Sequence, residues 1–288
     1  MPRRFGLSFV EQTLQKTLRW ILGSEGRSLK PRPGVPIPKN QLLPVHDKDA
    51  TMNPHLIASL TIALLSASHG AWAGRPLASD DAGTAEAGTC QLESWVERAG
   101  SENALVLAPA CGIAKDLELG ADYTLPRTRG VVRAGAGIAF KWVPQTWRVG
   151  TPAGELNFGV KLGAAFEHPA AAGWRTAEIG ALALATLAAS DSWSWHANLG
   201  AVRERSSGTT AALLNLALVW TPRDEALLFL ETQANNRRDV FGGTVNTVGG
   251  RWWLVKDSFG VDLTASREAG AGSGTSWTMG FGWYGLGF

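Results

Sequence analysis

Apolar and polar side chains alternate residue by residue over long stretches of this sequence, from Thr89 to its end. In residues 155–167 the even positions are Leu, Phe, Val, Leu, Ala and Phe, whereas the odd positions are mostly charged, polar or glycine. The same alternation recurs over 131–143, 193–204 and 258–266. Because successive side chains of a β-strand point to opposite faces, this period predicts strands with one apolar and one polar face.

The predicted strands are also long. Strands of soluble proteins cluster near about 5–6 residues, whereas a tilted strand that crosses a membrane needs about 9–11. Most of the predicted strands reach the second length, which argues against a soluble β-sandwich. The predicted strands are residues 89–97, 104–112, 116–125, 131–143, 154–167, 174–188, 192–204, 211–221, 226–235, 244–256, 258–267 and 276–288.

The predicted connections differ in length in a regular way. Those after the second, sixth, eighth and tenth strands are tight, such as 114–115 and 189–191. Those after the first, fifth, seventh, ninth and eleventh strands are longer and rich in Gly, Ser, Asn and Pro, such as 236–243. Short turns on one rim and long loops on the other are typical of outer-membrane barrels. The stretch 144–153 departs from this order, and the sequence offers no reason for it.

A sheet of this kind must close on itself if it is to cross a membrane. Each backbone N–H or C=O left unpaired in hydrocarbon costs several kcal/mol, so an open edge cannot persist there. The predicted fold is therefore all-β: a single antiparallel up-and-down transmembrane β-barrel of about 12 strands, apolar toward lipid and polar inside. Tryptophans near the strand ends are expected to form an aromatic girdle: Trp142, Trp174, Trp193, Trp220, Trp252 and Trp277.

Residues 52–73 are predicted to be a secretory signal peptide. They hold an apolar run, 56–67, and end in Ala71-Trp72-Ala73, which has the A-x-A form of a cleavage site. The run is shorter than the ~20 residues that a membrane-spanning helix needs; the alternative is a buried helix of a soluble domain. No Lys or Arg lies between Met52 and the apolar run, which departs from the usual signal peptide.

The position of this signal suggests that residues 1–51 are a disordered or over-called extension before a true start at Met52. A cytoplasmic or membrane-surface tail is the alternative, because residues 7–22 form a basic amphipathic pattern. Residues 74–288 are then the barrel, exported through the periplasm to the bacterial outer membrane. This part holds slightly more acidic than basic residues, so no nucleic-acid partner is expected.

Cys90 and Cys111 are the only cysteines of the sequence. A hairpin of the first two strands with its tip near 100–101 pairs Glu97 with Ala104 and, in the same register, Cys90 with Cys111. Directly opposed Cβ atoms lie about 4.5–5.5 Å apart, close to disulfide distance, and the periplasm permits the bond. A Cys90–Cys111 disulfide is therefore predicted. Two thiols with no histidine nearby do not make a metal site.

The last predicted strand ends in an aromatic residue. Tyr284, Leu286 and Phe288 are expected to share one face of it. This ending resembles the carboxyl-terminal signal of bacterial outer-membrane barrels, which implies the barrel-assembly machinery as a partner. The alternative is an ordinary aromatic edge strand.

Residues 75–93 open with R-P-L-A-S-D-D-A-G and continue into a first strand that contains Leu92-Glu93. This opening, with Leu117-Glu118-Leu119-Gly120 in the third strand, resembles a proteobacterial family catalogued as putative transporters of the MetA phenol-degradation pathway. The resemblance implies an outer-membrane barrel that takes up small molecules, including aromatic or hydrophobic compounds. Motif identity is confined to about 75–125, and the resemblance supplies no functional residues. The two cysteines lie outside the general pattern of that family.

The polar faces of the strands supply the candidate site residues, which line the expected lumen. Twelve strands enclose more space than a filled eight-stranded barrel and less than a 16-stranded porin. A hydrated lumen conducts small solutes, and its acidic excess favours cations; a fully salt-bridged lumen is plugged and gives a structural or adhesive barrel. The sequence leaves both open. The predicted lumen-lining residues are Glu93, Glu118, Asp122, Arg133, Lys141, Glu155, Lys161, Glu178, His196, Glu231 and Asp262, with Glu97 and Glu204 also turned inward.

Ser194, His196 and Asn198 lie on one face of one strand and are superficially similar to the Ser/His/Asn set of outer-membrane phospholipases. Residues two apart on a strand are ~6.5–7 Å apart, which predicts that they are too distant for the ~3 Å hydrogen bonds of a catalytic triad. They are interpreted as lumen lining, and no catalytic residue, cofactor or metal is expected. The expected function is an outer-membrane channel for small-molecule solutes, embedded in the lipid bilayer. A lipid-hydrolysing enzyme is the less favoured alternative.

Overall fold

The computed structural model describes residues 77–100, 102–128, 131–132, 134–169, 173–269 and 274–288. The predicted extension, 1–51, and the predicted signal peptide, 52–73, lie outside the described residues, as does Arg133. Within the described ranges, no helix is long and apolar enough to cross a membrane.

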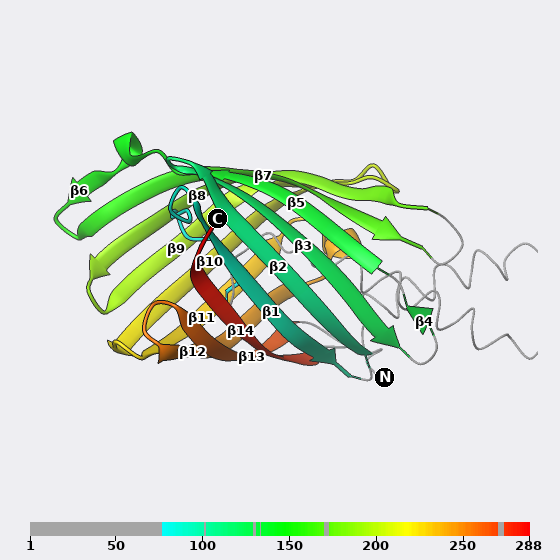
Figure 1. Cartoon of the computed structure of the whole chain (residues 1–288). Coiled ribbons are helices and arrows are strands. Elements are labelled where there is room, and N and C mark those ends of the chain that lie inside the picture. Colours follow the sequence, from blue (N-terminus) through cyan, green and yellow to red (C-terminus); the bar gives the residue numbers. More distant parts are fainter. Residues whose placement is uncertain (1–76, 101, 129–130, 133, 170–172, 270–273) are drawn as a thin grey trace, which may run out of the picture.

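The chain folds into a closed antiparallel barrel of 12 long strands, each paired with its neighbours in sequence (Figure 1). Eleven of them are continuous: β1 (Thr89–Ala99), β2 (Glu102–Ala114), β3 (Leu117–Thr128), β7 (Gly154–His168), β8 (Arg175–Ser190), β9 (Trp193–Glu204), β10 (Thr210–Arg223), β11 (Ala226–Asn235), β12 (Thr244–Val255), β13 (Phe259–Ala269) and β14 (Thr275–Gly287). The remaining barrel strand is formed by β4 (Val131–Val132) and β5 (Ala134–Trp142), which pair with successive parts of β3.

The barrel closes where the first strand meets the last. β1 pairs with β2 on one side and with β14 on the other, from Thr89 opposite Gly287 to Ala99 opposite Ser276. This seam leaves neither β1 nor β14 as an open edge, so the backbone N–H and C=O groups of both strands find partners. The predicted fold class is confirmed.

Side-chain polarity is inverted relative to a soluble barrel. On β7, Leu162 is 56% exposed, whereas its neighbour Lys161 is 7% exposed. On β13, Leu263 is 55% exposed and Asp262 only 4%. The alternation in the sequence thus places apolar side chains on the outer surface and charged side chains inside. All six tryptophans predicted for the girdle are exposed, and Trp193 stacks on Trp220 with ring centroids 5.6 Å apart.

The irregular stretch 144–153 extends the hairpin between β5 and β7 beyond the barrel. It contains a 3-10 turn, η1 (Gln145–Trp147), and a short strand, β6 (Val149–Thr151), which pairs only with β7. Trp147 packs edge-on against Trp142, with ring centroids 4.9 Å apart. The connection 236–243 holds a short helix, α3 (Arg238–Phe241), that was not predicted. The prediction of a long loop after the first strand is wrong, because β1 ends at Ala99 and β2 starts at Glu102.

The first hairpin has the predicted register. Glu97 lies opposite Ala104 and Cys90 opposite Cys111. The two cysteines form a disulfide, which confirms the prediction.

Candidate functional site

The segment before β1, residues 77–88, lies inside the barrel and is called the lumen strap below; it is cyan in Figure 1. Its residues Ser79, Asp80 and Ala82 are buried. At its end, Ala87 forms an isolated bridge with Gly112 of β2, and the N–H of Gly88 donates to the carbonyl of Gly112 over 2.9 Å. The chain therefore passes through the lumen before it enters the wall.

Asp80 is the centre of the strap and is only 2% exposed. Its backbone N–H donates to Oδ1 of Asn198, and its carbonyl accepts from Nδ2 of the same amide, each over 2.8 Å. Its carboxylate oxygens lie 2.7 Å from Nζ of Lys161 and 3.5 Å from Nζ of Lys141. Asp80 thus joins β9 on one side to β5 and β7 on the other.

Side chains of the wall hold the strap on both sides of Asp80. The backbone N–H groups of Ala78 and Ser79 donate to the carboxylate of Glu231 on β11. The N–H of Ala85 donates to Oε2 of Glu118 on β3 over 2.8 Å. β3 and β11 lie six strands apart in the ring of 12, so the strap crosses the full width of the lumen.

Asp81 adds a second carboxylate beside Lys141, at 3.2 Å, and its side chain remains 58% accessible within the lumen. Burial by the surrounding wall raises the pKa of the Asp81 carboxyl, but the Lys141 ammonium and hydrogen bonds from Lys141 and the Gly83 N–H outweigh it. The pKa of Asp81 therefore lies below its ordinary value of 3.8.

A second buried cluster lies at the seam. Nη2 of Arg251 on β12 lies 3.0 Å from Asp262 on β13 and 3.6 Å from Glu93 on β1. The Tyr284 hydroxyl on β14 contacts both Arg251 and Glu93. These ion pairs and hydrogen bonds join four neighbouring strands inside the barrel.

The contacts of Tyr284 correct one prediction. Tyr284 points into the lumen, whereas Leu286 lies opposite Cys90 beyond a register shift in the β1–β14 pairing. Gly285 between them has a φ of +71°, a conformation that glycine adopts without strain. The expectation that Tyr284, Leu286 and Phe288 share one face is wrong because the strand bulges at Gly285. Their role as an assembly signal stays a prediction.

The predicted lumen residues fall into three groups. Asp122, Glu155 and His196 are partly exposed, and Arg133 lies outside the described residues. The buried residues are Glu93, Glu118, Lys141, Lys161, Glu178, Glu231 and Asp262.

The sequence interpretation missed the strap. It treated Ser79-Asp80-Asp81 as part of a family pattern, and the sequence around a lysine of the wall does not indicate which carboxylate will contact it.

Ser194, His196 and Asn198 do not form a triad. Oγ of Ser194 lies 3.4 Å from Nε2 of His196, so the prediction that they are too distant to interact is wrong: the imidazole reaches along the strand. Nδ1 of His196, however, contacts the Thr186 hydroxyl at 2.9 Å, and the Asn198 amide is occupied by Asp80. Since both ring nitrogens contact hydroxyl groups, no carboxylate or amide in the described part of the chain orients the imidazole, and the arrangement lacks the third member of a hydrolytic site. Among the described residues, no group of three or more His, Cys, Asp or Glu side chains could hold a metal ion.

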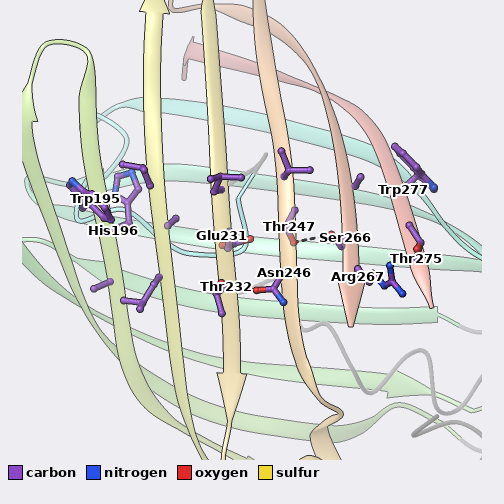
Figure 2. A pocket seen from close by; sticks show the side chains of 17 residues that line it. Trp195, His196, Glu231, Thr232, Asn246, Thr247, Ser266, Arg267, Thr275 and Trp277 are labelled. Carbon is purple, nitrogen blue, oxygen red and sulfur yellow. Dashed lines mark hydrogen bonds between the residues drawn. The ribbon is translucent and has the colours of Figure 1, made fainter. Parts of the chain in front are cut away.

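The barrel also has a shallow groove of about 890 Å³, shown in Figure 2, which crosses β9 to β14. Trp195 and Trp277 lie at its two ends, and Leu230 and Val248 lie between them. These four side chains are exposed, but His196 and Glu231 of the lumen wall also line the groove, so it is not confined to the apolar outer face.

A family model described as "Uncharacterised conserved protein UCP029691" matches residues 61–282. No curated protein matches the sequence. Among solved structures, the chain is similar to a KdgM porin in complex with disordered oligogalacturonate, with a TM-score of 0.51 at 10% identity over 67% of this chain and 98% of that one.

Two further solved structures have lower scores. The COG4313 outer membrane channel from Pseudomonas putida F1 has a TM-score of 0.48 at 10% identity, over 75% of this chain and 98% of that one. Outer membrane phospholipase A from Escherichia coli has a TM-score of 0.43 at 10% identity, over 71% of this chain and 93% of that one. The likeness to the porin shows that the two chains share a fold.

Proposed function

The chain belongs to the family of uncharacterised conserved proteins UCP029691, and from this premise and the polarity of its barrel we propose that it is an outer-membrane channel for small solutes. The observation that carries the proposal is the inverted polarity: exposed Leu162 and Leu263 outside, buried Lys161 and Asp262 inside. A surface of this kind is stable only against lipid. Enclosed charged side chains favour hydrated solutes over the lipid tails outside.

The lumen strap lies across the proposed path. It crosses from β3 to β11, and its Asp80 carboxylate neutralises Lys141 and Lys161 on the wall. A solute that passes must move beside the strap or displace it. We therefore propose that the strap limits conductance. The similarity of its S-D-D-A-G residues to the phenol-pathway transporters supports a small organic solute, and that narrower identity stays a prediction.

Single-channel recording in planar lipid bilayers tests this function. The full chain is expected to give discrete openings, and the double variant Asp80→Ala/Asp81→Ala to give larger ones, because it removes the ion pairs that hold the strap to Lys141 and Lys161. Asp191→Ala/Asp224→Ala, which removes two carboxylates from exposed turns, is the matched control and is expected to leave conductance unchanged.

A non-conducting structural barrel is the second candidate, and the strap itself favours it, since five wall strands bond to residues 78–82 alone. In that case both the wild-type chain and Asp80→Ala/Asp81→Ala stay silent although they are folded. A silent wild type with a conducting variant instead indicates a channel that the strap closes.

A further inference from the structure

Two carboxylates lie side by side on β8 and β9 near the long-loop rim, the end of the barrel that carries the connections 205–209 and 236–243. Glu178 of β8 faces inward there, because its neighbour Ile179 is exposed on the outer surface. Glu204 of β9 lies directly opposite Glu178 in the strand register. Directly opposed side chains on neighbouring strands have Cβ atoms about 4.5–5.5 Å apart. Two like charges are therefore held side by side.

Glu178 is the member of this group that lacks compensation. It is 6% exposed, and the carboxylates of Glu204, opposite it in the strand register, and of Glu167 both act on it as like charges. Glu167 is paired with Arg175, 2.7 Å away. Glu204 accepts the N–H groups of Ser206 and Ser207 over 2.7 and 2.6 Å. Among the described residues, no donor or cation reaches the Glu178 carboxylate.

A buried carboxylate beside other carboxylates is unfavourable when no cation is bound to it. Burial disfavours a carboxylate, and neighbouring carboxylates disfavour it further. Removing the partner of a buried charge is strongly destabilising because the remaining charge is left uncompensated, and a cation that enters relieves part of that cost. The site is also screened less by salt than an exposed pair would be. Glu178 and its neighbours therefore favour a positively charged ligand.

The chemistry of the site narrows the ligand class. The carboxylates of Glu167, Glu178 and Glu204 do not come together as the ligands of a metal ion. An ammonium or guanidinium group, in contrast, bonds to carboxylates through several N–H donors and tolerates a looser arrangement. The site lies near the long-loop rim, three residues from the start of β8, and Thr186, the strap contact on the same strand, is eight residues away or ~26 Å along β8.

We propose that Glu178, with Glu204 opposite it, forms a binding site for small organic cations that carry an ammonium or guanidinium group. This proposal rests on the proposed channel function and identifies the solutes as organic cations. A cation binds at the long-loop rim, between the rim and the lumen strap. Glu178 supplies the uncompensated charge, and Glu204, which is held by two backbone N–H groups, supplies a fixed second acceptor.

Equilibrium binding tests the site without any need for current. The full chain, folded in detergent micelles, is titrated calorimetrically with n-butylguanidinium, and with n-butylurea as its neutral isostere. The wild type is expected to bind the cation and not the urea. Glu178→Gln is expected to bind the cation at least tenfold more weakly, as befits the loss of a charge-assisted hydrogen bond. Glu204→Gln is expected to show a smaller loss.

Glu225→Gln, which removes a carboxylate from an exposed turn, is the matched control and is expected to bind like the wild type. Without ligand, Glu178→Gln is expected to raise the melting temperature, since it removes an uncompensated charge; a purely structural carboxylate would lower it. Equal affinity in wild type and Glu178→Gln overturns the site. A barrel that conducts but does not bind refutes the site alone, whereas one that binds but never conducts refutes the channel alone.

Discussion

At the scale of single residues, the lumen is a set of charges that compensate one another unevenly. Asp80 is compensated twice, by Lys161 and Lys141, whereas Glu178 is compensated by nothing in the described structure. A buried ion pair contributes little net stability when it is intact. Removing one partner is costly because the other charge stays buried without compensation. The two carboxylates should therefore respond to substitution in opposite directions.

Lys161→Gln should lower the free energy of unfolding by about 3 kcal/mol, because it leaves Asp80 buried with only the longer Lys141 contact. Urea unfolding in micelles measures the loss. Lys256→Gln is the matched control: its pair with Asp224 is exposed on both sides, and such pairs contribute about 0–1 kcal/mol. Equal losses in the two variants would show that the strap does not depend on Lys161.

Acidification should release the strap only at low pH. The pKa of Asp81 lies below its ordinary value of 3.8 because of Lys141, so the folded state prefers the charged carboxylate. Its stabilising contribution is present above the ordinary pKa and is lost as pH falls through the lowered one. The protection factors of the backbone amides of residues 78–85, which correct for the intrinsic pH dependence of exchange, should stay high through pH 4 and fall only below it. Loss of protection already near pH 5 would contradict the assignment.

At the scale of elements, the first hairpin and the closing seam determine whether the barrel forms. β1 carries the disulfide to β2 on one side and the Glu93 contacts to Arg251 and Tyr284 on the other. A strand with a disulfide to one neighbour and a side-chain hydrogen bond to the other is fixed in register. This explains why β14 can bulge at Gly285 without opening the ring.

Cys90→Ser/Cys111→Ser should lower the free energy of unfolding by about 3 kcal/mol, since the bond closes a loop with a sequence separation of 21. Reduction of the wild type by dithiothreitol should give the same change in the same urea titration. A double variant as stable as the oxidised wild type would show that the β1–β2 pairing needs no covalent support.

At the scale of the whole molecule, the inverted polarity distinguishes a membrane barrel from a soluble one. In water, Leu263 is already exposed, and replacing it with a charged residue would cost little. In a bilayer, the same position meets lipid tails near the middle of β13. The two environments therefore predict different costs for one substitution.

Leu263→Arg should destabilise the barrel by ~2–4 kcal/mol in lipid vesicles, the cost of arginine near the bilayer midplane. Val255→Arg, at the last residue of β12 and equally exposed, should cost ~0–1 kcal/mol because it lies at the rim. Heat-modifiable migration on gels after urea titration measures both. Equal costs at the two positions would contradict the membrane placement.

The local pattern of the sequence was sufficient for the wall of the barrel and for the Cys90–Cys111 pair, because strand period and hairpin register act between residues close in sequence. Period two placed Lys161 and Asp262 inside and Leu162 outside for the same reason. Only the tertiary structure decided how the lumen is used. The contacts of Asp80 with Asn198 and Lys161 join residues 118 and 81 positions apart, and the different faces of Tyr284 and Leu286 depend on a bulge at Gly285. Such contacts arise only after the ring has closed and brought distant strands to one enclosed space.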